Sequence, residues 1–342
     1  MGLLGGFVLL SYLYLGVSAL ILYRVVRGWR ALFDRQLTPD DAHLATSAAF
    51  FLLLPPVVAL HEAGHAAAVV ALGGKVLKVA FYGFMGAVWH ASMGPRDDFL
   101  VALAGNLVTV LLGAAVLGWA LLRPGHPVSN ILRIELARQA LFLELVLYPV
   151  LCLFTHGDFR VIYDFGATPL ASGLTAGAHA LILAVGWGWW WRRRALPRAR
   201  ALCGRSAFTL VEAERALARD PTDLAAQRAL GLAWGRAGVP RQALAYLMPL
   251  VARGAVGAEV ELAVGVALAD CARPAEARAH LERAAEVPQP DLRGRALVAL
   301  AGVRLALGEH EAARQAAQEA LRLRLTEPGL QADLRAILAR LG

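Results

Sequence analysis

The stretch His-Glu-Ala-Gly-His at positions 61–65 constrains this chain most, because it lies inside an apolar run from Leu44 to Leu72. That run is long enough to cross a bilayer as a helix. A charged side chain at the bilayer centre costs about 2.5–3.5 kcal/mol on insertion scales, so such residues persist chiefly where they have a function. Ionisable groups in this position therefore predict a functional site at membrane depth.

The spacing of these residues suits a metal site. In a helix, His61 and His65 stand one turn apart and point to the same side, so both imidazoles can reach one metal ion. Glu62 lies about 100° further round the helix, beside the place of a metal-bound water. Zinc with an open coordination position lowers the pKa of its water to ~7, and a neighbouring carboxylate can then move the proton. The motif predicts a zinc hydrolase; a lost ancestral site, or a polar cluster that only packs helices, is the alternative.

Composition places the first part of the chain in a membrane and argues against nucleic-acid binding. The chain is 58% hydrophobic with a mean hydropathy of +0.53 and a net charge of +8. Nearly all of the charge excess falls in residues 1–205, in short segments beside apolar runs, where it orients spans in a membrane. Residues 206–342 are nearly balanced in charge and have no basic stripe with interleaved aromatics. The three cysteines lie too far apart to predict a disulfide framework.

Five apolar segments are expected to span the membrane as helices. They cover residues 3–23, 44–72, 99–122, 131–154 and 174–191. No positive charge precedes the first and no small-residue cleavage site follows it, which predicts a retained anchor rather than a signal peptide. Pro55-Pro56 interrupts the second span, either as an ordinary kink or as a path for water or substrate to His61. The last span ends in Trp-Gly-Trp-Trp-Trp and three arginines, the pattern of a membrane interface.

Between the second and third spans, residues 75–93 are rich in β-branched and aromatic residues, and Gly83 and Gly86 are placed for a turn. This composition predicts a short β-hairpin. An exposed strand edge here could hold an unwound substrate segment in extended form. His90 on the hairpin is either a spare metal ligand or, more commonly for such a position, a surface histidine.

Other polar residues at span ends are further candidates. Asn106 in the third span either makes an interhelical hydrogen bond or orients substrate or water. Catalytic zinc usually has three protein ligands and one open position, so a third ligand is expected. His156 and Asp158 both follow the fourth span, and spacing alone does not separate them. In a purely structural role, Asp158 would be a loop carboxylate paired with Arg160.

Residues 195–205 are predicted to form a linker, and residues 206–342 a helical repeat region. Three copies align so that Ala243, Ala277 and Ala313 share one position, at intervals of 34 and 36 residues. That period, with small residues where paired helices touch, resembles a tetratricopeptide array. Such solenoids present a concave surface to peptides or proteins.

A His-Glu-Ala-Gly-His span, a hairpin after it and an aspartate at the end of a later span together resemble the site-2 protease family. These proteins are intramembrane zinc metalloproteases. The resemblance covers residues 1–194 and implies that His61, His65 and Asp158 hold zinc while Glu62 activates water.

The resemblance extends to the third span. The stretch from Gly94-Pro95 to Asn106 is similar to the family's third-helix motif, although Thr109 stands where the family has asparagine. The usual Asp-Gly pair appears here as Gly157-Asp158-Phe159. The same zinc motif occurs in membrane-tethered ATP-dependent metalloproteases, but this chain has no G-x-x-x-x-G-K-[ST] phosphate loop, which excludes that class.

The chain is thus expected to be an all-α membrane bundle of about five transmembrane helices with a small β-hairpin, followed by a soluble α-helical tetratricopeptide-like solenoid. Its expected location is the cell (inner) membrane, multi-pass. Loops after the first, third and fifth spans carry thirteen Lys and Arg against four in the others, which places the repeats in the cytoplasm. The family resemblance implies the reverse orientation, with the active site nearer the cytosolic face.

The predicted function is that of an intramembrane zinc metalloendopeptidase that cleaves transmembrane protein substrates in the lipid bilayer and binds a protein or peptide partner on its repeats. The competing hypothesis is a non-proteolytic membrane scaffold with a vestigial or structural metal site. Coordination separates the two, because a closed four-ligand site is structural and an open three-ligand site is catalytic.

Overall fold

A computed structural model describes residues 3–254, 257–323, 325 and 327–341 of the chain, with the side chains of residues 3–8, 187, 189, 190 and 194 outside this description. The fold is 78% helical with one two-stranded antiparallel sheet, which confirms the predicted helical class and its small hairpin. The chain divides into two compact units, Met1–Arg205 and Ser206–Gly342. The predicted aromatic belt at 187–191 falls largely on side chains outside the described ones.

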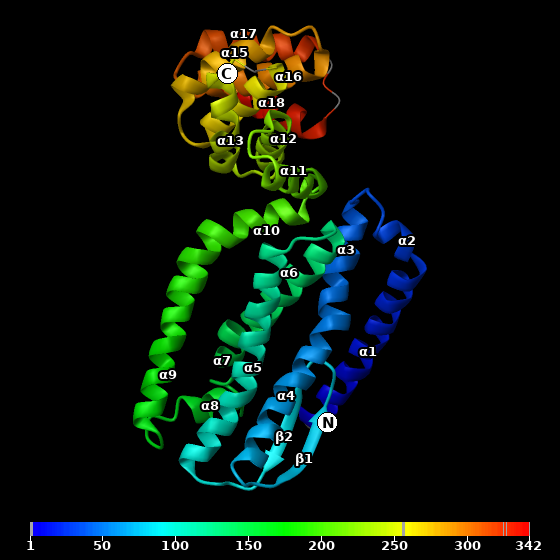
Figure 1. The fold of residues 1–342 in the computed structure, drawn as a ribbon, viewed down its shortest axis with the longest axis vertical. Helices are drawn as coiled ribbons and strands as arrows, with labels where there is room; N and C mark the ends of the chain where they lie inside the picture. Colours follow the sequence, from blue (N-terminus) through cyan, green and yellow to red (C-terminus); the bar gives the residue numbers. More distant parts are fainter. Residues whose placement is uncertain (1–2, 255–256, 324, 326, 342) are drawn as a thin grey trace. The chain divides into compact units, whose positions relative to one another are not determined.

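The first unit contains the apolar helices and the hairpin (Figure 1). Its elements are α1 (Leu3–Arg27), α2 (Trp29–Leu32), α3 (Pro39–Ala48), the π-helical turn η1 (Ala49–Leu53), α4 (Leu54–Ala71), β1 (Val76–Phe81), β2 (Gly86–His90), α5 (Pro95–Leu122), α6 (Pro127–Phe142), the π-helical turn η2 (Leu143–Leu147), α7 (Tyr148–Leu151), α8 (Asp158–Ile162), α9 (Pro169–Leu181), the π-helical segment η3 (Ile182–Ala195) and α10 (Leu196–Cys203).

Among the described residues, four helical stretches are long and apolar enough to cross a membrane. They are Leu9–Arg27, Pro39–Ala71, Pro95–Leu122 and Pro169–Arg193. The predicted span at 131–154 is not one of them. The chain is helical there as far as Leu151, but Arg133, Glu135, Arg138 and Glu144 make the segment too polar to qualify by composition.

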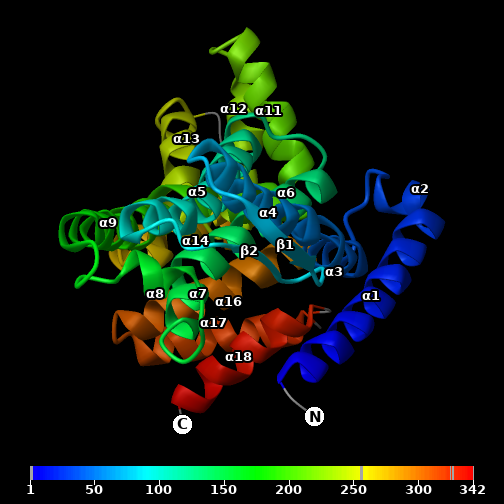
Figure 2. The same cartoon turned by 90° about the horizontal axis from the view of Figure 1, so that it is seen from below.

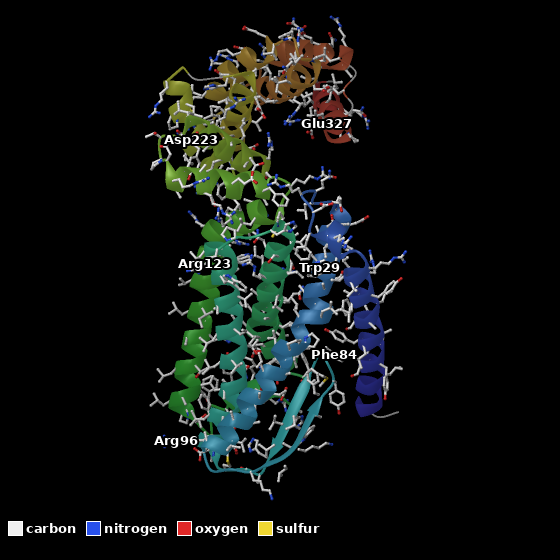
Figure 3. All side chains as sticks on the ribbon, turned by 45° about the vertical axis from the view of Figure 1, so that its right-hand side comes forward. Trp29, Phe84, Arg96, Arg123, Asp223 and Glu327 are labelled. Carbon is white, nitrogen blue, oxygen red and sulfur yellow. The ribbon has the colours of Figure 1, made fainter. Side chains whose placement is uncertain are left out.

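Helix α5 is the centre of this unit and packs against both α4 and α6. Its 28 residues extend about 42 Å, and Figure 3 shows Arg96 and Arg123 at its two ends. Gly64 of α4 lies against Gly105 of α5, where a Cβ on Gly64 would stand 3.1 Å from the Gly105 Cα. Small residues of this kind let membrane helices approach closely. Helices α1 and α9 lie on opposite sides of this group (Figures 1 and 2).

Two prolines explain how α1 is attached to the π-helical turn η1. Pro55 and Pro56 have no backbone N–H to donate, so two carbonyls one turn earlier lose their helical partners. In a π-helical turn the partner of each N–H is the carbonyl five residues earlier, so the two carbonyls are those of Phe50 and Phe51. The Tyr14 hydroxyl of α1 donates to the Phe50 carbonyl at 2.6 Å, and the Ser18 hydroxyl donates to the Phe51 carbonyl at 3.0 Å. A neighbouring helix thus satisfies the groups that the prolines freed, as membrane burial requires.

The same arrangement attaches α9. Pro149 leaves the carbonyl of Leu145 without its α-helical partner, and His179 of α9 donates to that carbonyl through Nε2 at 2.8 Å. The other ring nitrogen of His179 accepts a hydrogen bond from the Tyr163 hydroxyl. Both outer helices are therefore tied to the interior at π-helical turns.

The hairpin lies beside α4. β1 and β2 pair antiparallel from Val76↔His90 to Phe81↔Gly86. Gly83 adopts φ +82° in the connecting turn, a conformation that favours glycine. Gly86 was also predicted in the turn, but it is the first residue of β2 instead. Phe84 in the turn packs against the Tyr14 ring of α1 at a centroid distance of 5.6 Å, and Figure 3 shows it between the hairpin and that helix.

The segment 195–205, predicted as a linker, forms helix α10 for most of its length. Ala199, Ala201 and Leu202 are buried in the first unit, and the Leu202 carbonyl accepts a hydrogen bond from Asn130 of α6 at 3.3 Å. Alanine, leucine and arginine all favour helices, and these apolar positions recur at helical spacing. The segment is therefore packed against the first unit.

The second unit is entirely helical within its described residues. Its helices are α11 (Ala207–Arg219), α12 (Leu224–Arg236), α13 (Pro240–Ala252), α14 (Ala258–Asp270), α15 (Pro274–Ala285), α16 (Pro290–Ala306), α17 (His310–Arg322) and α18 (Pro328–Leu341). Each helix packs on the next, and α12, α14 and α16 also contact one another in series.

Equivalent turns recur in this unit. Gly238, Ala272 and Gly308 close α12, α14 and α16 with φ of +69°, +59° and +78°. Ala272 is the one non-glycine residue with positive φ among the described residues. The aligned alanines at 243, 277 and 313 are all fully buried. The sequence period is thus matched by a period in backbone conformation.

Candidate metal centre

Three side chains from two helices meet inside the first unit. His61 and His65 lie one turn apart on α4, and Asp158 begins α8. The two Nε2 atoms are 3.0 Å apart, and Asp158 Oδ2 lies 3.4 Å from His61 Nε2 and 3.1 Å from His65 Nε2. They form the one group of three His, Cys, Asp or Glu residues found, in the part of the chain that the structure describes, with geometry able to hold a metal ion.

The other ring nitrogens define the tautomers. His65 Nδ1 lies 2.7 Å from the carbonyl oxygen of Val101, which can only accept, so Nδ1 carries the proton. His61 Nδ1 lies 2.9 Å from the hydroxyl of Thr109, which itself donates to the Gly105 carbonyl. Both histidines therefore present an Nε2 lone pair toward Asp158.

The distances agree with zinc coordination. Zn–N and Zn–O bonds of about 2.0–2.2 Å at tetrahedral angles place ligand atoms about 3.3–3.6 Å apart, close to the spacing of these three. Three electron-pair donors facing one another in a buried site repel unless a cation or protons lie between them. The donor set therefore fits zinc.

Asp158 is held by two further residues. Asn106 Nδ2 of α5 donates to Asp158 Oδ2 at 3.1 Å and to the Ala102 carbonyl at 2.7 Å. The Tyr148 hydroxyl donates to the same carboxylate oxygen and accepts from the Asp158 backbone N–H, each at 3.2 Å. Gly157 is required beside them, because a Cβ there would stand 2.6 Å from Cys152 Sγ. These contacts aim the carboxylate at the two histidines.

Glu62 is buried, with 7% of its surface exposed, and its Oε2 has no hydrogen-bond partner among the described residues. The backbone of Gly86 lies directly over this side chain, and a Cβ on Gly86 would stand 2.4 Å from Glu62 Cγ. Glycine at the start of β2 therefore lets the hairpin cover Glu62. A buried carboxylate oxygen without a partner can accept a proton from a water molecule or substrate group beside it.

The other candidates lie elsewhere. His156 is exposed and is not in the group with His61 and His65, so the structure brings together Asp158 rather than His156 with the histidines. His90 Nδ1 lies 2.9 Å from the Ala91 carbonyl oxygen, outside that group. Asn106 donates to Asp158 and so makes a hydrogen bond between α5 and α8, one of the two roles expected for it.

Three site residues were missed as such in the sequence. Thr109 was noted only as a departure from a motif, and neither Glu144 nor Tyr148 was singled out as a candidate. Glu144 had a usable signal, since an acid within an apolar helix is expensive to bury. Tyr148 and Thr109 had none, because ordinary membrane helices contain both residue types.

Comparisons with protein-family models, curated proteins and solved structures found no match to this chain.

Proposed function

We propose that this chain is an intramembrane zinc metalloprotease. One observation carries the proposal, namely that two Nε2 lone pairs and one carboxylate oxygen converge at zinc-like distances, with both histidines on a helix that is apolar enough to cross a membrane. His61, His65 and Asp158 would be the zinc ligands. Three protein ligands leave a coordination position for water or substrate, as in catalytic zinc sites.

Zinc, when bound, supplies a Lewis acid that polarises water and the peptide carbonyl. The chain's own contribution begins with Glu62, whose unpartnered Oε2 would take a proton from the attacking water and pass it to the leaving amine nitrogen. Asn106 and Tyr148 would keep Asp158 aligned throughout. Burial of the site strengthens these electrostatic interactions by excluding bulk water.

The hairpin supports peptide substrates in particular. A helical substrate shields its peptide bonds, so it must unwind before hydrolysis, and a strand edge binds extended backbone. β2 begins at Gly86, in contact with Glu62, so a segment paired with the hairpin would run past the general base. The substrate class would be transmembrane proteins with helices that unwind readily.

The membrane placement and the repeats complete the proposal. The protein would be multi-pass in the cell (inner) membrane, with α6, η2 and α7 as an additional crossing shielded by its neighbours. The charge bias of the loops supports a cytoplasmic second unit. Recurring turns at 238, 272 and 308 and serial helix contacts support a tetratricopeptide-like array that docks a protein or peptide.

The first test is the zinc content of the full-length chain purified in detergent. We expect about one zinc per wild-type chain, loss of that zinc in Asp158→Ala, and retention in the matched control His156→Ala, which removes an exposed residue two positions away. A wild-type chain that takes up no zinc after supplementation would refute the metal site. Zinc lost in His156→Ala but kept in Asp158→Ala would refute the ligand assignment.

The second test separates a protease from a scaffold. Wild-type and Glu62→Gln chains are reconstituted in liposomes with a single-span test protein whose helix contains helix-breaking residues. We expect Glu62→Gln to keep zinc and lose cleavage. Equal cleavage by both chains would rule out Glu62 as the general base. A zinc-loaded wild type inert toward a panel of such substrates, with a fourth protein ligand on the metal, would support a structural site.

A further inference from the structure

Glu144 is a buried acid without a role in the mechanism above. It lies in η2 with 5% of its surface exposed, and its Oε2 is 3.5 Å from His61 Nδ1. Its second oxygen, Oε1, has no hydrogen-bond partner among the described residues. Burying a carboxyl group with an unsatisfied oxygen is unfavourable, and an apolar residue of similar size would pack there at lower cost. Stability therefore does not explain this residue.

The backbone conformation around Glu144 places this residue beside His61. η2 is a π-helical turn, a feature that is rare and occurs frequently at functional sites. The turn holds Glu144 toward His61, and the residue that follows it, Tyr148, bonds to Asp158. One irregular turn thus supports two of the three proposed metal ligands, on different helices.

The chemistry at His61 follows from its two acceptors. Nδ1 is shared between the Thr109 hydroxyl at 2.9 Å and the Glu144 carboxyl at 3.5 Å. The hydroxyl orients the ring, but its own hydrogen bond to the Gly105 carbonyl is long, at 3.4 Å, so it fixes the tautomer less firmly than a carboxylate does. A carboxylate accepts only; it keeps the proton on Nδ1 and makes Nε2 a stronger metal ligand.

We infer that Glu144 is a positioning residue that holds His61 in its metal-binding tautomer and raises the affinity of the site for its metal. The inference rests on the proposed zinc site. Glu144 acts through His61 and does not contact the substrate.

The test measures metal affinity and stability separately. Zn²⁺ affinity of the full-length chain is determined by competition with a chromophoric chelator, and the melting temperature is measured without metal. We expect Glu144→Leu to weaken zinc binding by about 10–100-fold, the usual effect of losing such a partner, while the metal-free melting temperature stays the same or rises. Glu144→Gln, which keeps an acceptor oxygen but no charge, should recover part of the affinity.

Glu135→Gln is the matched control, since this acid lies on the adjoining helix α6 and pairs with Arg138 instead. It should bind zinc as wild type does. A cobalt-substituted sample adds a spectroscopic readout, because a tilted His61 ring changes the visible absorption of bound Co²⁺, whereas the control should leave it unchanged.

Each failure has its own signature. Wild-type zinc affinity in both Glu144 variants would overturn the inference while leaving the zinc site intact. Equal losses of affinity and metal-free stability in both variants would make Glu144 structural and also overturn it. Absence of zinc binding in the wild type would instead refute the proposed function, and the inference with it.

Discussion

Replacing Gly105 by alanine provides a sharp test of the metal centre. Gly105 lies in the interior of α5, where alanine normally stabilises a helix by about 1 kcal/mol relative to glycine. At this position, however, a Cβ would stand 2.4 Å from His65 Nε2 and 2.5 Å from Cε1. The imidazole lies between the Val101 carbonyl and Gly105, so the methyl group would meet the Nε2 edge of the ring, the edge proposed to bind the metal.

The magnitude follows from these distances. Ordinary contact begins at 3.4 Å, so the ring must retreat from 2.4 Å by roughly 1 Å. Metal–ligand distances tolerate only about 0.2 Å, and His65 is held by its 2.7 Å contact with Val101. We expect at least a ~100-fold loss of zinc affinity, equivalent to about 2.8 kcal/mol, despite the favourable helix propensity of alanine.

The assay is chelator competition on the full-length chain in detergent, with Gly118→Ala as the matched control. Gly118 is on the same helix, and a Cβ there meets nothing within 4 Å. The control should bind zinc as wild type does and melt at the same or a higher temperature. If Gly105→Ala also bound zinc with wild-type affinity, His65 could not be a ligand in this geometry, and the site as described would be wrong.

Three further predictions concern other parts of the chain. Gly86→Ala should keep zinc but lower cleavage at least tenfold, because its Cβ would displace Glu62; cleavage at the wild-type rate would contradict this contact. Ala272→Gly should raise the free energy of unfolding by about 1 kcal/mol, because glycine adopts the positive φ of this position without strain. The control Ala269→Gly lies within α14, where glycine is a poor helix former, and should lower that free energy by about the same amount in thermal unfolding. Burial raises the pKa of Glu261, but hydrogen bonds from Arg283 and His280 outweigh it, so the pKa lies below its ordinary value of 4.5. Ionised Glu261 therefore stabilises the fold at neutral pH, and this stabilisation declines as the pH falls below about 4.5. Glu261→Gln should lower the free energy of unfolding by about 1–2 kcal/mol at pH 7 and by less at pH 3, as measured by denaturant titration. An equal loss at both pH values would refute the pairing.

Local patterns were sufficient for much of the fold. Helical class, the hairpin at 75–93 and the pairing of His61 with His65 all depend on periodicity or spacing within one element, which a sequence displays directly. The segment 195–205, predicted as a linker, is helical for most of its length, because helix-forming residues there pack against α6. The span predicted at 131–154 contains four charged residues and does not qualify as a span by composition.

The amino-acid sequence by itself determined that an ionisable His-Glu-Ala-Gly-His motif lies in an apolar helix, and that a repeat of 34 to 36 residues follows. Spacing alone did not separate His156 from Asp158 as the third ligand, since the two are only two residues apart, although the family resemblance implied Asp158. The tertiary structure decided between them, because α8 begins at Asp158 and Tyr148 turns its carboxylate toward α4. It also placed Glu144 at His61, and Gly105 beneath His65. Such contacts join helices far apart in the chain, and their energies depend on distances between atoms that no local pattern of residues specifies.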